Sequence, residues 1–103
     1  MGHLDSIFFF STIQNNIVFE VEYNELYFGA YRETQYDYLT SSLSWYVVSK
    51  PSWITVKPSS GSGSVNLQIT ASSNFNSSPR YGIIELSNNS TTITINVEQD
   101  GAY

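Results

Sequence analysis

Apolar and polar residues alternate along most of the chain in short runs, and no useful length of it repeats with the period of a helix. Alternation with a period of two places apolar side chains on one face of a β-strand. We therefore predict seven strands, which recur about every ten residues, over residues 17–22, 35–39, 44–48, 53–56, 65–71, 81–86 and 91–97.

The last two runs form the strongest hairpin signal, because the four polar residues 87–90 separate two alternating segments. Antiparallel sheets commonly bury one face and leave the other in water. We expect Tyr81 and Ile83 to point outward, together with Thr92, Thr94 and Asn96. The residues expected to face the core are Ile84, Leu86, Ile93, Ile95 and Val97.

The two tryptophans lie on either side of a proline corner. Pro51 ends the run that contains Trp45, since proline cannot donate to a strand ladder, and Trp53 follows directly. An indole ring can stack on a sugar, or it can pin two sheets together from inside. We expect Trp45 in the core, whereas for Trp53 both interpretations stay open. A flexible Gly- and Ser-rich turn is expected at residues 59–64.

Length and charge narrow the function classes. The chain has 103 residues, enough for one hydrophobic core, and its net charge is −5. Its cations are only Arg32, Lys50, Lys57 and Arg80, too few and too scattered to bind nucleic acid or an anionic membrane. The absence of cysteine excludes disulfides, thiolate metal sites and a cysteine nucleophile.

No catalytic constellation is visible in the sequence. The one histidine, His3, lies in an atypical N-terminal segment, and Glu20 and Glu22 share a strand face that we interpret as solvated. Gly61 and Gly63 lie between strands with no helix to follow, so they form a turn rather than a phosphate loop. We predict no enzymatic activity, no cofactor and no metal site.

Residues 1–16 form a separate N-terminal arm in our prediction, followed by the domain at 17–103. The arm contains the apolar run Ile7, Phe8, Phe9 and Phe10, which is too short for a signal peptide core. Strand side chains alternate, so these four cannot all face one core. The run is either an extra edge strand or an arm that docks on a neighbouring subunit by strand addition, and we favour docking.

Eight tyrosines exceed what a core of this size needs. An exposed tyrosine supplies a large contact area at low entropic cost, which suits either a glycan or a protein surface. The candidate binding face consists of Tyr31, Tyr36, Tyr38, Tyr46 and Tyr81.

Several motifs together resemble the BACON domain family, a Bacteroidetes-associated group whose name refers to carbohydrate binding. The similarity extends from Phe19 to Gly101. The motifs are Leu26-Tyr27-Phe28-Gly29, Ser44-Trp45, Pro51-Ser52-Trp53-Ile54-Thr55-Val56, Pro58-Ser59-Ser60-Gly61-Ser62-Gly63, Arg80-Tyr81-Gly82-Ile83-Ile84, and the terminal segment from Ile93 to Gly101. The resemblance implies an all-β, immunoglobulin-like sandwich of about seven antiparallel strands, from gut Bacteroidetes or their phages.

Two functions are compatible with these features. The apolar arm and the lack of an export signal favour an accessory decoration protein on a bacteriophage capsid or virion, assembled in the host cytoplasm. Its partner would be the major capsid protein or another virion protein, and a displayed face could contact glycans. The alternative is a carbohydrate- or mucin-binding module of a gut Bacteroidetes surface protein.

Overall fold

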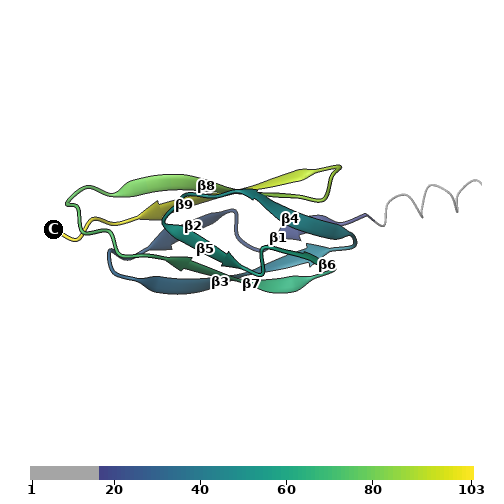
Figure 1. The fold of residues 1–103 in the computed structure, drawn as a ribbon, viewed down its shortest axis with the longest axis horizontal. Helices are drawn as coiled ribbons and strands as arrows, with labels where there is room; N and C mark the ends of the chain where they lie inside the picture. The colour runs from purple at the N-terminus through teal and green to yellow at the C-terminus, as the bar shows by residue number, and fades with distance from the viewer. Residues whose placement is uncertain (1–16) are drawn as a thin grey trace, which may run out of the picture.

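The computed structural model describes residues 17–103, so the predicted arm and its apolar run at Ile7–Phe10 lie outside the described residues. Two β-sheets pack face to face in this part of the chain (Figure 1). The nine strands are β1 (Phe19–Val21), β2 (Glu25–Phe28), β3 (Glu33–Ser41), β4 (Ser44–Ser49), β5 (Ile54–Lys57), β6 (Ser60–Ser62), β7 (Val65–Ala71), β8 (Arg80–Ser87) and β9 (Thr92–Gln99).

One sheet has the order β1-β3-β7-β5, and the other has the order β2-β9-β8-β4-β6. The predicted all-β, immunoglobulin-like sandwich is confirmed. The strand pairs are antiparallel except for β2 and β9, which run parallel. The sequence predicts about seven antiparallel strands, so β2, β6 and the parallel pair are differences from that prediction.

Both additional strands depend on partners that local sequence does not reveal. β2 pairs with a strand about seventy residues away, with Glu25 opposite Asn96. β6 contains no apolar residue, but Gly61 lies against the ring of Trp45, where an added Cβ would approach Cζ2 to 3.2 Å. The expected turn at 59–64 is therefore strand over Ser60–Ser62, and Gly63, with φ of 85°, supplies the left-handed turn.

The core fills the space between the sheets. Trp45, at 3 % exposure, lies inside and donates its indole N–H to the carbonyl of Gly63 at 3.0 Å. The five inward residues expected from the hairpin are also buried, and Tyr81 and Ile83 are exposed. The buried apolar residues are Leu26, Phe28, Leu39, Trp45, Ile54, Val56, Leu67, Ile69, Ala71, Ile84, Leu86, Ile93, Ile95 and Val97.

A buried carboxyl group interrupts this apolar interior. Asp37 on β3 is fully buried, and its Oδ1 accepts the backbone N–H of Tyr23 at 2.9 Å. Its Oδ2 has no hydrogen-bond partner among residues 17–103. Burial raises the pKa of Asp37 above its ordinary value, an effect that the nearby Glu22 carboxylate reinforces and that hydrogen bonds from the backbone of Tyr23 and Glu22 oppose.

Two buried amides hold the loops at the end of the sandwich that carries the C-terminus (Figure 1). The Gln99 Nε2 group donates to the carbonyls of Gly29, Ala30 and Ser72 at 3.0, 3.3 and 2.7 Å. The Gln99 Oε1 atom accepts the Nε–H of Arg80 at 2.8 Å. A second buried amide, on Asn74, donates to the carbonyls of Ser78 and Asp100, so side chains add to the backbone hydrogen bonds that join the loops at this end.

Candidate functional site

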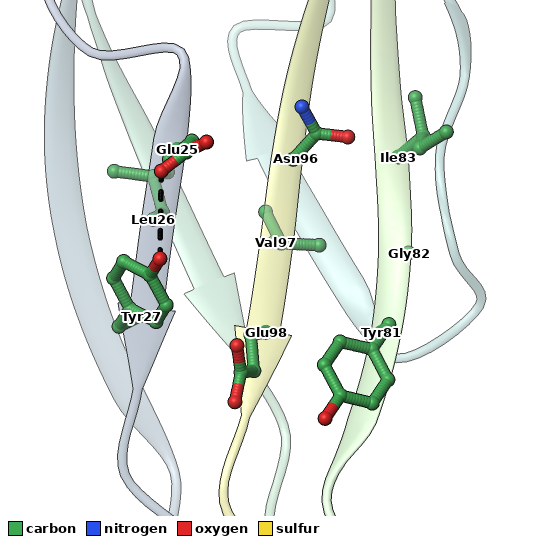
Figure 2. Close-up of a pocket in the computed structure, with 9 residues that line it drawn as sticks. All are labelled: Glu25, Leu26, Tyr27, Tyr81, Gly82, Ile83, Asn96, Val97 and Glu98. Carbon is green, nitrogen blue, oxygen red and sulfur yellow. Dashed lines mark hydrogen bonds between the residues drawn. The ribbon is translucent and has the colours of Figure 1, made fainter.

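An open groove of about 490 Å³ lies on the outer face of the five-stranded sheet. It crosses three neighbouring strands, with β9 in the middle and β2 and β8 on either side (Figure 2). The residues that line it are Glu25, Leu26, Tyr27, Tyr81, Gly82, Ile83, Asn96, Val97 and Glu98.

Strand alternation turns the groove side chains outward. On β2, Leu26 and Phe28 are buried in the core, so Tyr27 between them faces solvent. The same alternation around Val97 on β9 and around Gly82 on β8 exposes their neighbours. The outward residues are Glu25, Tyr27, Tyr81, Ile83, Asn96 and Glu98 (Figure 2).

The strand register places three of these side chains in one row across the sheet. Glu98 is directly opposite Tyr27 on β2 and directly opposite Tyr81 on β8. Figure 2 shows the two rings on either side of the carboxylate. Tyr27 is 65 % exposed and Tyr81 is 67 % exposed, so both rings are open to a ligand.

A second row lies beside the first. It consists of Asn96 on β9 with Glu25 opposite it on β2 and Ile83 opposite it on β8 (Figure 2). The two rows together offer two aromatic rings, an aliphatic side chain, an amide and two carboxylates. An apolar surface with a few convergent polar groups is typical of small-molecule sites.

The carboxylates also act on the adjacent phenol of Tyr27. The Tyr27 hydroxyl donates to Glu25 Oε1 over a long 3.4 Å contact. The pKa of Tyr27 is raised, mainly by the negative charge of Glu25 and further by partial desolvation, this hydrogen bond and the charge of Glu98. A phenolate is therefore disfavoured at this position beside Glu25 and Glu98.

The five tyrosines predicted as one binding face do not share a face. Tyr46 and Tyr81 lie on the five-stranded sheet, and Tyr36 and Tyr38 lie on β3 in the opposite sheet. Tyr31 lies in the β2–β3 loop, where its ring meets Phe75 edge to face with centroids 6.3 Å apart. Of this set, the structure brings Tyr81 alone into the groove.

Tyr27 completes the groove and is absent from the predicted face. The alternation of Glu25 and Tyr27 with two large apolar residues is a signal that Tyr27 points outward. Its position beside Glu98 depends on the parallel pairing of β2 with β9, for which the sequence contains no local signal.

The tryptophans offer no open platform comparable to the two groove tyrosines. Trp45 is in the core, as described above. Trp53 is partly buried, and the guanidinium of Arg80 lies 4.5 Å from the centroid of its ring. Pro51 lies beside the same ring, against Gly82.

A smaller hollow of about 370 Å³ lies on the other sheet. It is lined by Glu20, Val21, Glu22, Tyr38 and Thr40. It presents one aromatic ring, where the groove on the five-stranded sheet presents two. The latter groove is therefore the stronger candidate site.

Two classes of site are not found in the described part of the chain. Residues 17–103 contain no group of three or more His, Cys, Asp or Glu side chains placed to hold a metal ion. No helix within the same residues is long and apolar enough to cross a membrane.

Comparison with solved structures yields several proteins of the same fold. A Bacteroides ovatus GH5 xyloglucanase, solved in complex with a XXXG heptasaccharide, matches 82 % of this chain with 27 % identity and a TM-score of 0.76. This chain spans only 19 % of the xyloglucanase. A Bacteroides thetaiotaomicron protein solved by NMR matches at 12 % identity and a TM-score of 0.59, covering 82 % of this chain and 87 % of its own.

A more distant structure shares the fold alone. The periplasmic chaperone SfaE matches 84 % of this chain and 59 % of its own, at 7 % identity and a TM-score of 0.59. No curated protein sequence matches the chain.

The family comparison extends over most of the folded domain. The model of the BACON family, described as a putative binding domain, N-terminal, matches residues 43–100. This segment runs from the start of β4 to the end of β9, so it includes two of the three groove strands. The chain belongs to the BACON family.

Proposed function

We propose that this domain is a non-catalytic carbohydrate-binding module of a Bacteroidetes surface or secreted protein, and that it binds its ligand in the groove over β2, β9 and β8. The observation that carries the proposal is the row of Tyr27, Glu98 and Tyr81, with an exposed ring on each side of a carboxylate.

The chemistry of this row suits a sugar. A pyranose ring has apolar C–H faces and a rim of hydroxyl groups. Tyrosine rings supply apolar contact area with few rotatable bonds, so little entropy is lost on binding. Glu98 accepts hydrogen bonds from hydroxyls, and Asn96 can both donate and accept. All of these side chains lie on strands, which hold them in place before the ligand arrives.

The comparisons support this proposal over the phage one. The family is described as a binding domain, and the xyloglucanase structure holds an oligosaccharide. Neither comparison supports a capsid partner or a virion location, which the sequence had favoured. The surface-module alternative therefore replaces the decoration protein as the proposed function.

Affinity electrophoresis and titration calorimetry with a panel of polysaccharides and oligosaccharides test the proposal. Tyr27→Ala and Tyr81→Ala are each expected to weaken binding roughly fivefold, because a stacked aromatic contributes on the order of 1 kcal/mol. Tyr36→Ala is the matched control, since Tyr36 is 56 % exposed on the opposite sheet. If glycan binding is unchanged in both groove variants, or is lost only in Tyr36→Ala, the groove is not the binding site.

The non-catalytic part of the proposal has its own test. Incubating the purified domain with each ligand should leave the chain length of the glycan unchanged. Turnover that persists in repeated purifications would contradict it.

A further inference from the structure

We propose that the groove selects uncharged, extended glycan chains that cross the strands, and that it rejects glycans with carboxylate or sulfate groups. This inference rests on the proposed function and adds to it the class of ligand and the direction in which it lies.

The charges of the groove carry the first step. Glu25 and Glu98 lie on adjacent strands, in neighbouring rows of the groove. All four Lys and Arg residues belong to the described range 17–103, and none of them lines the groove. An anionic sugar seated between the tyrosines would therefore face two carboxylates without a cation to pair with.

The nearest candidate cation is held elsewhere. Arg80 adjoins Tyr81 in sequence, but its guanidinium lies over Trp53 at 4.5 Å. It also donates to Gln99 Oε1 at 2.8 Å and to the carbonyls of Ser72 and Ser73 at 3.1 and 3.2 Å. Turning Arg80 into the groove would break all of these contacts.

The remaining cations belong to other parts of the molecule. Lys50 donates its Nζ group to the carbonyl of Ile54 at 2.7 Å. Lys57 lies on β5 in the other sheet, opposite Gln68 of β7, and Arg32 lies in the β2–β3 loop. None of these three cations lines the groove, so in this structure no cation is placed to pair with a ligand charge there.

The repulsion is large enough to decide selectivity. Two like charges about 4 Å apart interact by about 1 kcal/mol in water and by more near a protein surface. Each unpaired ligand charge next to Glu98 is therefore expected to weaken binding at least about fivefold, and a chain with several charges by more. The raised pKa of Tyr27 agrees with this, since its phenol already experiences both carboxylates.

The direction of the ligand follows from the row of tyrosines. Tyr27 and Tyr81 lie on β2 and β8, with β9 between them, so two strand spacings of roughly 10 Å in total separate their backbones. A chain that stacks on both rings must run across the strands and over Glu98. It must also present two sugar faces to one flat surface, which an extended chain does and a tightly coiled one does not.

The test compares neutral and anionic ligands on the intact domain. The neutral set is xyloglucan oligosaccharide, cello-oligosaccharide and manno-oligosaccharide, and the anionic set is oligogalacturonate and a sulfated glycosaminoglycan. Calorimetry is done at low and at physiological ionic strength, because salt screens the repulsion. We expect at least one neutral chain to bind, and the anionic chains to bind at least tenfold more weakly. This difference in affinity should be larger at low salt.

Charge-removing variants test whether the groove carboxylates cause the difference in affinity between neutral and anionic ligands. The double variant Glu25→Gln and Glu98→Gln is expected to narrow the neutral-to-anionic ratio at least tenfold. Glu20→Gln, on the exposed face of β1, is the control and should leave the ratio unchanged. Thermal unfolding curves of each variant check that the fold is intact.

The outcomes separate the two proposals. If anionic chains bind as tightly as neutral ones and lose binding in Tyr27→Ala, the proposed selection against charge is wrong. The proposed carbohydrate site in the groove is then still supported. A ratio unaffected by the double glutamine variant would also overturn the selection against charge. If neither class of glycan binds, the proposed function itself fails.

Discussion

Gln99 is a buried polar residue whose replacement should cost this domain much of its stability. Its side chain is fully buried and joins three carbonyls and one guanidinium, which come from the β2–β3 loop, the 72–79 loop and β8. Gln99→Leu keeps an approximately equal volume but removes both halves of the amide. The change therefore isolates hydrogen bonding from packing.

The size of the stability loss depends on which partners of Gln99 keep another hydrogen bond in the variant. The carbonyl of Ala30 still accepts the N–H of Asn74, and the carbonyl of Ser72 still accepts Arg80 Nη2. The carbonyl of Gly29 and the Nε–H of Arg80 lose the amide. A buried polar group left without a partner costs about 1–3 kcal/mol, and both of these hydrogen bonds are part-buried. We therefore expect a net loss of about 3 kcal/mol once the apolar leucine side chain has offset part of the cost.

Thermal unfolding followed by circular dichroism measures the effect. For a domain of this size, 1 kcal/mol shifts Tm by about 4–8 °C, so Tm should fall by roughly 12–24 °C. Gln68→Leu on the outer side of β7 is the control, with an expected change within about 0.5 kcal/mol. If Gln99→Leu falls within the same margin as the control, the buried amide does not hold this end of the fold as described.

Three further perturbations test other parts of the molecule. Asp37 has a raised pKa in the folded state, so the folded state binds its proton more tightly and stability falls as pH rises through that pKa. Asp37→Asn should therefore flatten the dependence of Tm on pH. An unchanged slope of Tm against pH would contradict this. Gly82→Ala should lower the free energy of unfolding, measured by urea denaturation, by about 1–3 kcal/mol, because its Cβ would collide with Pro51, whereas Gly29→Ala should not. If the run at residues 7–10 docks on a neighbouring subunit, the full chain should sediment as an assembly, and the chain without residues 1–16 should sediment as a folded monomer. An unfolded product would refute the docking arm.

Local periodicity predicted an all-β chain and seven of its nine strands, whereas the immunoglobulin-like arrangement was implied by the family resemblance. The alternation from Tyr81 to Val97 identifies both the hairpin and its buried face, because a period of two leaves only one choice of side once the apolar residues are seen. The same reasoning places Tyr36 and Tyr38 on the opposite face of their strand from Asp37. It does not reveal the lack of a partner for Asp37 Oδ2, because that depends on contacts distant in sequence.

The candidate site was predicted less completely, since it depends on which strands are neighbours. Tyr31, Tyr36, Tyr46 and Tyr81 are all exposed, but the sheet order separates them. Sequence patterns show on which side of a strand a tyrosine lies and not which strand lies beside it. The groove became visible only with the pairing of β2 on β9.

That pairing also bears on how binding preferences change between related proteins. The family model matches residues 43–100, which include Tyr81 and Glu98, whereas Tyr27 precedes that segment. One wall of the groove is thus contributed by β2, a short edge strand outside the segment that the family model matches. Substitutions in β2 can replace an aromatic wall with a polar or charged one while the matched segment stays intact. If the groove binds a glycan as proposed, relatives that share the matched segment are expected to differ in ligand, and the residue aligned with Tyr27 is the first one to compare.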